Sequence, residues 1–148
     1  MARQKFGHIV NTASVAGLSP LPLSTPYAMT KHAVVGLSRS IRPEAAWYGV
    51  KVSVACPGFI ATKLFDHGVG LGQVPFRETT SLGVSWAIPP ERAAKRILRG
   101  VRRNKEIIVF PFHGKMMAIG ERFARWVGVL VSRRLVAQFH RKRARTST

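Results

Sequence analysis

Three residues near the start of the chain have side chains and a spacing that suit proton transfer. Ser14 ends the segment IVNTAS (9–14), Tyr27 follows it by thirteen residues, and Lys31 follows the tyrosine by four. A free tyrosine has a pKa of about 10, and a nearby ammonium favours tyrosinate and lowers that value. Since an acid/base group works best when its pKa lies near the operating pH, Lys31 would tune Tyr27. The Ser14 hydroxyl would hold a carbonyl or alcohol oxygen beside the Tyr27 hydroxyl.

A helix must carry the tyrosine and the lysine. The run 25–48 repeats apolar residues at helical spacing, and Ser24 and the following threonine offer hydroxyl caps. Pro26 is tolerated in a first turn, and Gly49 is a natural stop. Pro43 is expected to kink this helix or to break it. A tyrosine and a lysine four apart then share one helical face.

The rest of the chain predicts alternating strands and helices. Segment 7–14 begins apolar and β-branched and ends polar, which indicates a strand, and 50–56 predicts a short buried strand. Further elements are a helix over 91–104 with Ala94, Ile97, Leu98 and Val101 on its apolar face, a strand over 106–111, amphipathic helices over 112–139, and a disordered basic tail over 140–148.

Four motifs in order resemble the second half of a short-chain dehydrogenase/reductase. A tyrosine and a lysine four apart are common on helices, so the resemblance depends on the whole set. The matching segments are GHIVNTASVAG (7–17), PYAMTKHAVVGLS (26–38), GVKVSVACPG (49–58) and the Thr62 that follows. The resemblance implies an α/β fold with a partial Rossmann-like, doubly wound parallel sheet that lacks the N-terminal dinucleotide-binding strands.

The resemblance also implies roles for these residues in hydride transfer between NAD or NADP and a carbonyl or secondary alcohol. Tyr27 would be the general acid/base, Lys31 would tune it and bind the nicotinamide ribose, and Ser14 would orient the substrate oxygen. Asn11 is interpreted as structural, and Thr30 replaces a serine that is more usual before the lysine. The residues implied to contact the nicotinamide end of the cofactor are Pro57, Gly58, Ile60 and Thr62.

Two parts of the family pattern are not found in this chain. No glycine-rich turn that would cradle a pyrophosphate opens it, and no Asn-Asn-Ala-Gly motif supplies the asparagine of the proton relay. The resemblance therefore predicts the catalytic half of a longer parent, cut at an internal methionine. We expect this truncated chain to lose most of its dinucleotide affinity and to be inactive alone. A non-catalytic remnant acting by subunit association, through the helix 25–48, is the alternative.

Residues 58–90 are rich in glycine and proline and predict a mobile substrate loop. Its apolar side chains would either line a pocket for a lipophilic substrate or pack the loop onto the sheet. These side chains are Phe59, Leu64, Phe65, Val74, Phe76 and Trp86.

The net charge of +18 is concentrated in the second half of the chain, with seven cations between 92 and 105 and nine more from Lys115 to Arg145. Three interpretations remain open. The cations form a solvated surface, or they flank apolar residues of 112–139 that contact an anionic membrane, or they bind nucleic acid without specificity. No aromatic-interleaved or helix-turn-helix motif supports specific nucleic acid recognition.

Composition sets the remaining limits. A chain of 148 residues with 46% hydrophobic residues is long enough for one domain with a core. The one cysteine, Cys56, can form no internal disulfide and is expected to be buried. The sequence shows no secretory signal, no apolar run of membrane-spanning length and no metal-ligand spacing among its histidines. These features favour a cytoplasmic protein, with membrane association left open.

Overall fold

The computed structural model describes residues 1–62 and 87–146, except for the side chains of residues 125 and 142–146. Strands and helices alternate along the chain. Most of the predicted substrate loop, including Leu64, Phe65, Val74, Phe76 and Trp86, lies outside the described residues. In order, the elements are β1 (Gly7–Thr12), the 3-10 turn η1 (Val15–Gly17), α1 (Thr25–Trp47), β2 (Val50–Pro57), α5 (Pro90–Arg102), β3 (Ile107–Phe110), α6 (Phe112–Phe123) and α7 (Arg125–Thr146).

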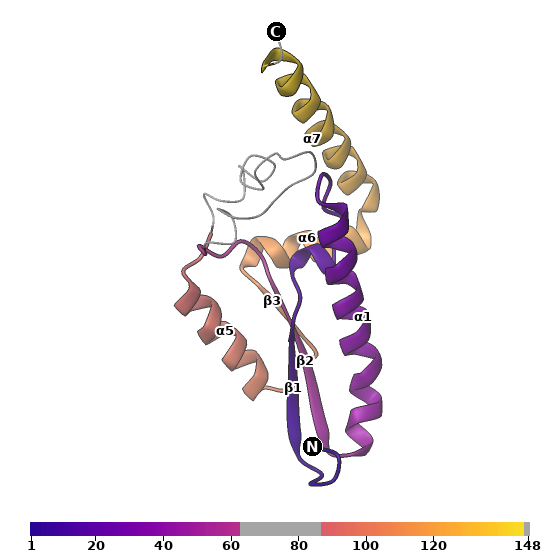
Figure 1. Ribbon diagram of the computed structural model, residues 1–148, viewed down its shortest axis with the longest axis vertical. Coiled ribbons are helices and arrows are strands. Elements are labelled where there is room, and N and C mark those ends of the chain that lie inside the picture. The colour runs from indigo at the N-terminus through magenta and orange to yellow at the C-terminus, as the bar shows by residue number, and fades with distance from the viewer. Residues whose placement is uncertain (63–86, 147–148) are drawn as a thin grey trace.

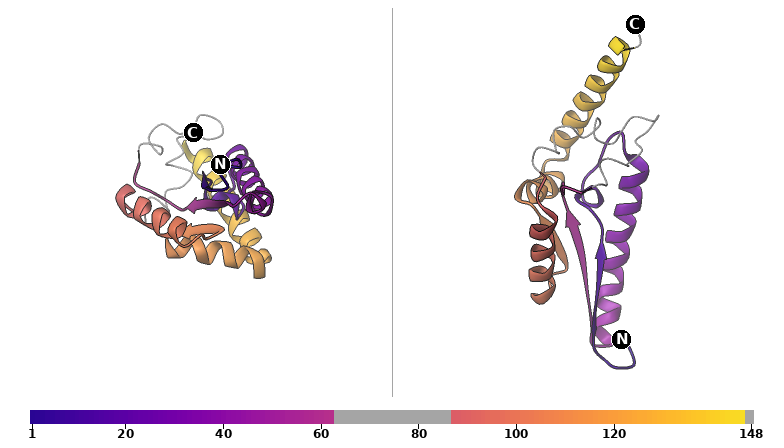
Figure 2. Two further views of the ribbon diagram at one scale, coloured as in Figure 1. Left: turned by 90° about the horizontal axis from the view of Figure 1, so that it is seen from below. Right: turned by 60° about the vertical axis from the view of Figure 1, so that its left-hand side comes forward.

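The strands form one parallel sheet in the order β1-β2-β3. Gly7 is opposite Val50, and Val54 is opposite Ile107. The central strand β2 is buried along its length except at Lys51, because α1 and α5 lie on opposite sides of the sheet (Figures 1 and 2). Helices on both faces of a parallel sheet confirm the predicted α/β class.

Each face of the sheet has its own apolar cluster. On the α1 face, Ala13, Val35, Val54 and Cys56 pack together. On the α5 face the cluster comprises Ala93, Ile108 and Phe110, with Ile60, Ile88, Ile97 and Val101 packed against it. Ile60 and Ile88 also form a short parallel bridge, so the chain segments on either side of 63–86 lie close together.

Helix α1 begins and ends close to the predicted residues. Ser24 is the N-cap residue, but its side chain makes no capping hydrogen bond. Gly49 has a φ of +70°, a conformation that suits glycine and ends the helix. Pro43 lies inside the helix without breaking it, so of the two expected effects, a kink or a break, the break is wrong.

Two predicted features of the second half are corrected. The core face of α5 is made by Ala93 and Gly100 with Ile97 and Val101, while Leu98 is 55% exposed and Ala94 is also exposed. The predicted disordered tail from residue 140 is wrong, because α7 continues to Thr146. After Gly128 this helix contains neither glycine nor proline and is rich in good helix formers, so nothing local ends it.

Helix α7 projects away from the sheet (Figure 1). Its first turns carry exposed apolar side chains, among them Trp126, Leu130 and Val131, and its later turns carry most of the cations. Between these two groups the sequence of the helix mixes both kinds, since Arg133 and Arg134 are followed by Leu135 and Val136. Within residues 1–62 and 87–146, no helix is long and apolar enough to cross a membrane.

Candidate active site

Ser14 lies where β1 ends, directly beside the end of β2. It is buried and is the N-cap residue of η1, where its Oγ accepts a hydrogen bond from the Ala16 backbone at 3.2 Å. The same hydroxyl donates to the Pro57 carbonyl oxygen at 3.4 Å. Parallel pairing brings these two strand ends together, so the structure joins Ser14 to the Pro-Gly motif forty-three residues away.

Tyr27 and Lys31 lie on successive turns at the start of α1, and both side chains are partly buried. The Lys31 ammonium is 5.5 Å from the centroid of the Tyr27 ring, a distance at which a cation is attracted to an aromatic face. Lys31 also donates to the Thr12 carbonyl oxygen at 3.5 Å. The lysine therefore connects the tyrosine to the last residue of β1, two residues before Ser14.

Gly17 determines how closely the turn after Ser14 approaches α1. A Cβ atom at Gly17 would lie 2.5 Å from the Lys31 carbonyl oxygen and 2.8 Å from the Lys31 carbonyl carbon. Only glycine fits this contact without displacing one backbone from the other. The sequence showed this glycine as part of a motif, and its spatial role emerges only from the packing of η1 on α1.

Of the residues expected at the nicotinamide, Pro57 and Gly58 are close to Ser14 or to its neighbours. Pro57 is buried, and the Gly58 backbone N–H donates to the Phe110 carbonyl oxygen at 2.7 Å. A Cβ atom at Gly58 would lie 3.5 Å from the His113 Nε2. His113, in the first turn of α6, is thus a neighbour of this site that sequence reasoning did not single out.

Ile60 and Thr62 continue away from this contact. The Ile60 side chain packs against the apolar cluster on the α5 face, and Thr62 is exposed. A contact of Ile60 with a cofactor would therefore involve its backbone. The Thr62 hydroxyl is available to a ligand.

Asn11 and Thr30 have hydrogen-bond partners within the fold that account for them. Asn11 Nδ2 donates to Ser38 Oγ at 3.0 Å, which ties β1 to the middle of α1. This contact agrees with the structural interpretation of the asparagine. Thr30 Oγ1 donates to the Tyr27 carbonyl oxygen at 2.7 Å, a bond within the helix that a serine could also make.

Cys56 lies fully buried in the α1-face cluster, next to Ser14 in space. Burial raises the pKa of its thiol to about 12, while a hydrogen bond from the Ser14 backbone acts in the opposite direction. A thiol that keeps its proton is a poor nucleophile. Cys56 is therefore a core residue, as expected.

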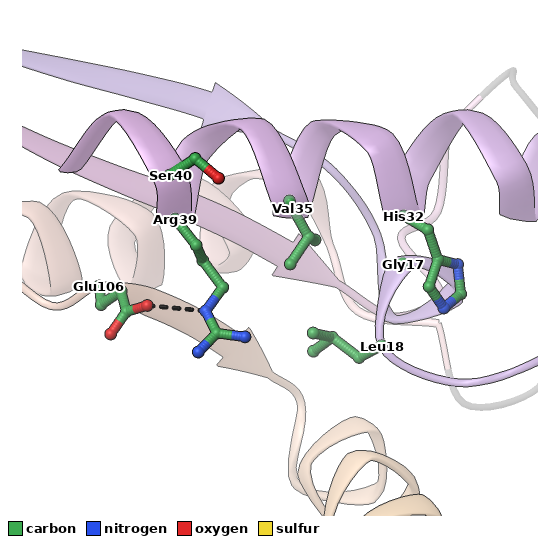
Figure 3. Close-up of a pocket in the computed structure, with 8 residues that line it drawn as sticks. Gly17, Leu18, His32, Val35, Arg39, Ser40 and Glu106 are labelled. Carbon is green, nitrogen blue, oxygen red and sulfur yellow. Dashed lines mark hydrogen bonds and ion pairs between the residues drawn. The ribbon is translucent and has the colours of Figure 1, made fainter. Parts of the chain in front are cut away.

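An open depression of about 590 Å³ lies beside α1 (Figure 3). Leu18 from the segment after η1 and Val35 from α1 are among its lining residues, and none of Ser14, Tyr27 and Lys31 is. Arg39 and Glu106 form an ion pair of 2.9 Å across it. Both of these side chains are about half exposed, so this pair contributes little to stability.

Comparison with known proteins places residues 1–68 under a family model described as short chain dehydrogenase. A putative ketoacyl reductase of the granaticin polyketide synthase from Streptomyces violaceoruber is 37% identical over 83 residues, 53% of this chain and 30% of that protein. The dehydrogenase/reductase SDR family protein 7-like of Drosophila melanogaster is 33% identical over 120 residues, 78% of this chain and 36% of that protein. The chain thus spans about a third of the length of these relatives.

Solved structures show the same architecture. A short-chain dehydrogenase from Sphingobium yanoikuyae in complex with NADPH superimposes with a TM-score of 0.61 at 22% identity, over 93% of this chain and 47% of that one. A short chain dehydrogenase/reductase from Burkholderia phymatum in complex with NAD gives a TM-score of 0.64 at 26% identity, over 74% of this chain and 44% of that one.

Proposed function

Because this chain belongs to the short-chain dehydrogenase family through the sequence of its first 68 residues, we propose that it supplies the catalytic half of an NAD- or NADP-dependent oxidoreductase. The observation that supports this most directly is the placement of Lys31, which contacts both the Tyr27 ring and the end of β1. The substrate class is a small carbonyl compound or secondary alcohol. The two solved relatives named above are complexes with NADPH and with NAD, which supports a dinucleotide without selecting its form.

The donor set on this chain suits the nicotinamide end of such a cofactor. Lys31 carries an ammonium that would hold ribose hydroxyls, and the Tyr27 and Thr62 hydroxyls with the backbone near Gly58 add polar groups around it. When bound, the dinucleotide supplies or accepts the hydride. No glycine-rich turn for the pyrophosphate opens these 148 residues. We therefore propose that the chain alone binds the dinucleotide weakly and turns over slowly or not at all.

The residues of the chain would divide the proton chemistry as follows. In reduction, Tyr27 donates its hydroxyl proton to the carbonyl oxygen of the substrate as the hydride reaches the carbonyl carbon. The Lys31 ammonium stabilises the negative charge that develops on the tyrosine oxygen. Ser14, held between Ala16 and Pro57, donates a hydrogen bond to the substrate oxygen once its hydroxyl turns from the Pro57 carbonyl.

Saturation-transfer NMR of NADH with the full chain tests the cofactor part of this proposal. We expect transfer to the nicotinamide and ribose protons, lost in Lys31→Ala. The matched control is Lys51→Ala, which removes an exposed lysine of β2. No transfer from the original chain to NADH at millimolar NADH, or equal transfer from Lys31→Ala, would overturn it.

We also propose that copies of the chain associate through α1. The helix exposes Met29, Leu37 and Trp47, which are 67%, 58% and 87% exposed. Light scattering should then detect a dimer that Leu37→Lys converts to a monomer. Leu98→Lys, at the 55% exposed position on α5, should leave the dimer intact. A monomeric original chain would contradict association, both for a catalytic chain and for a non-catalytic remnant.

A further inference from the structure

A second cavity, distinct from the candidate active site, is lined by residues of α5, β3 and α6 and of the turn between α5 and β3. Figure 1 shows the arrangement of these elements. Its volume is about 550 Å³, within the range of small-molecule sites. Gly100 sets its inner wall, because a Cβ atom there would lie 2.6 Å from the Ile108 side chain, so α5 packs directly on β3.

Five cations line this cavity, from two helices and from the turn between α5 and β3. Arg96 and Arg99 lie in α5 and Arg103 is its C-cap residue, and the three recur at helical spacing. Lys105 follows that helix, and Lys115 comes from α6. Among the described residues that line the cavity, none is acidic. Glu106, next to Lys105 in sequence, instead directs its carboxylate to Arg39 at 2.9 Å. Like charges gathered without a counterion repel one another, and an anion would relieve that repulsion.

The wall between these cations is apolar. Ile107 and Val109 come from β3, and Ala118 and Ile119 from α6. Ile119 is 51% exposed although it is among the larger apolar side chains of α6. A cationic rim around an apolar wall matches a ligand with an anionic head and a hydrocarbon chain.

We propose that this cavity binds an anionic amphiphile, with a phosphate held by the arginines of α5 and the lysines, and an aliphatic chain lying on β3 and Ile119. Guanidinium groups suit phosphate because they donate two parallel hydrogen bonds. A second copy of the chain does not fit this site, because it would bring the same cations of a +18 protein together. The site is independent of the proposed dehydrogenase chemistry.

Titration calorimetry with dodecyl phosphate, below its micelle concentration, tests the charge part. We expect binding that weakens by at least about tenfold in Arg99→Gln/Arg103→Gln and with added salt. The matched control is Lys95→Gln/Arg102→Gln, which removes two exposed cations of the same helix that do not line the cavity. Circular dichroism checks that both variants keep the fold. Equal weakening in both variants overturns the proposal.

The contribution of the apolar wall is tested by comparing ligands with and without a hydrocarbon tail. Inorganic phosphate should bind much more weakly than dodecyl phosphate, and dodecyl maltoside should not compete. Ile119→Ser should weaken dodecyl phosphate binding, whereas Met117→Ser, at a 45% exposed position elsewhere on α6, should not. Inorganic phosphate binding as tightly as dodecyl phosphate would contradict an amphiphile site.

An anionic head on a hydrocarbon tail is found both in a soluble alkyl phosphate and in an anionic phospholipid of a bilayer. Flotation with phosphatidylcholine vesicles, with and without phosphatidic acid, separates these sources. Co-flotation that requires phosphatidic acid and is lost in Arg99→Gln/Arg103→Gln identifies a bilayer ligand. Binding confined to dodecyl phosphate identifies a soluble one. Failure in both arms rejects the site, and neither result bears on NADH binding.

Discussion

Gly17 and Lys31 meet so closely that a Cβ atom on the glycine would lie 2.5 Å from the lysine carbonyl oxygen. This backbone contact fixes the turn that carries Ser14 against the helix that carries Tyr27 and Lys31. The two elements of the candidate active site are therefore joined by backbone packing as well as by the side-chain contact of Lys31 with Thr12. Substitutions at this contact should affect stability and cofactor binding together.

Gly17→Ala should destabilise the chain by about 1–3 kcal/mol, because the added methyl group overpacks a contact between two backbones. Urea unfolding followed by circular dichroism measures the change. The control is Gly36→Ala in α1, where a Cβ atom would meet nothing within 4 Å. That variant should gain roughly 0.5–1 kcal/mol from the better helix former. Equal effects of the two substitutions would contradict the close approach.

Tyr27→Phe should lower carbonyl reduction by roughly 10²–10⁴-fold, because it removes the proposed proton donor. Because the chain alone is proposed to turn over poorly, the assay should use this chain joined to a dinucleotide-binding segment. The melting temperature should change little, since the ring of this partly buried residue remains. Tyr48→Phe, at the C-cap of α1 and 51% exposed, controls for loss of a tyrosine hydroxyl. Full activity in Tyr27→Phe would rule out the proposed role.

The Cys56 thiol should react with a disulfide reagent only when the chain opens. It is fully buried, and it is the one cysteine, so the reaction has a single source. Near neutral pH we expect slow labelling of the native chain that accelerates with urea across the unfolding transition. Rapid labelling without urea would show that the α1-face cluster is not closed.

The same thiol should make the chain less stable in alkali. Its native pKa is raised to about 12 from an ordinary value of 9.0, so between these values the unfolded chain loses a proton that the native chain keeps. The free energy of unfolding is therefore unaffected below pH 9 and falls as the pH rises above it. By about pH 10 this group should cost roughly 1.4 kcal/mol. Cys56→Ala should lose this component of the alkaline decline, measured by urea unfolding.

His8 should contribute an acid sensitivity. Its pKa is lowered by burial, and then by Lys51 and Arg42, and its Nε2 lies 2.8 Å from Ser53 Oγ. Below the ordinary value of 6.5 the unfolded chain takes up a proton that the native chain resists, so stability present above that pH is lost as the pH falls. Urea midpoints at about pH 7.5 and about pH 5.5 should differ less in His8→Gln than in the original chain. His140→Gln, at an exposed position of α7, is the control. An unchanged difference in His8→Gln would contradict this account.

Local pattern was sufficient for the elements that have strong signals. Val52 and Val54 lie in a buried strand as the apolar run predicted, and Gly49 ends α1 because its φ of +70° suits glycine. The sequence pattern failed where more than one face of a helix carries apolar residues. In α5, Ala94 and Leu98 fitted an apolar stripe as well as Ala93 does, and only packing against Ile108 decided which side faces the sheet.

The sequence by itself determined the order of strands and helices and the spacing of Ser14, Tyr27 and Lys31, because turn residues, apolar periodicity and motif spacing are local properties of the chain. Tertiary structure decided which distant residues meet. The hydrogen bond from Ser14 to Pro57 and the contact of Gly17 with Lys31 depend on parallel strand pairing and on the approach of α1. The five cations around one apolar wall come from α5, from α6 and from two residues, Arg103 and Lys105, between α5 and β3. Their common neighbourhood follows from the way two helices pack at the edge strand, which no local pattern contains.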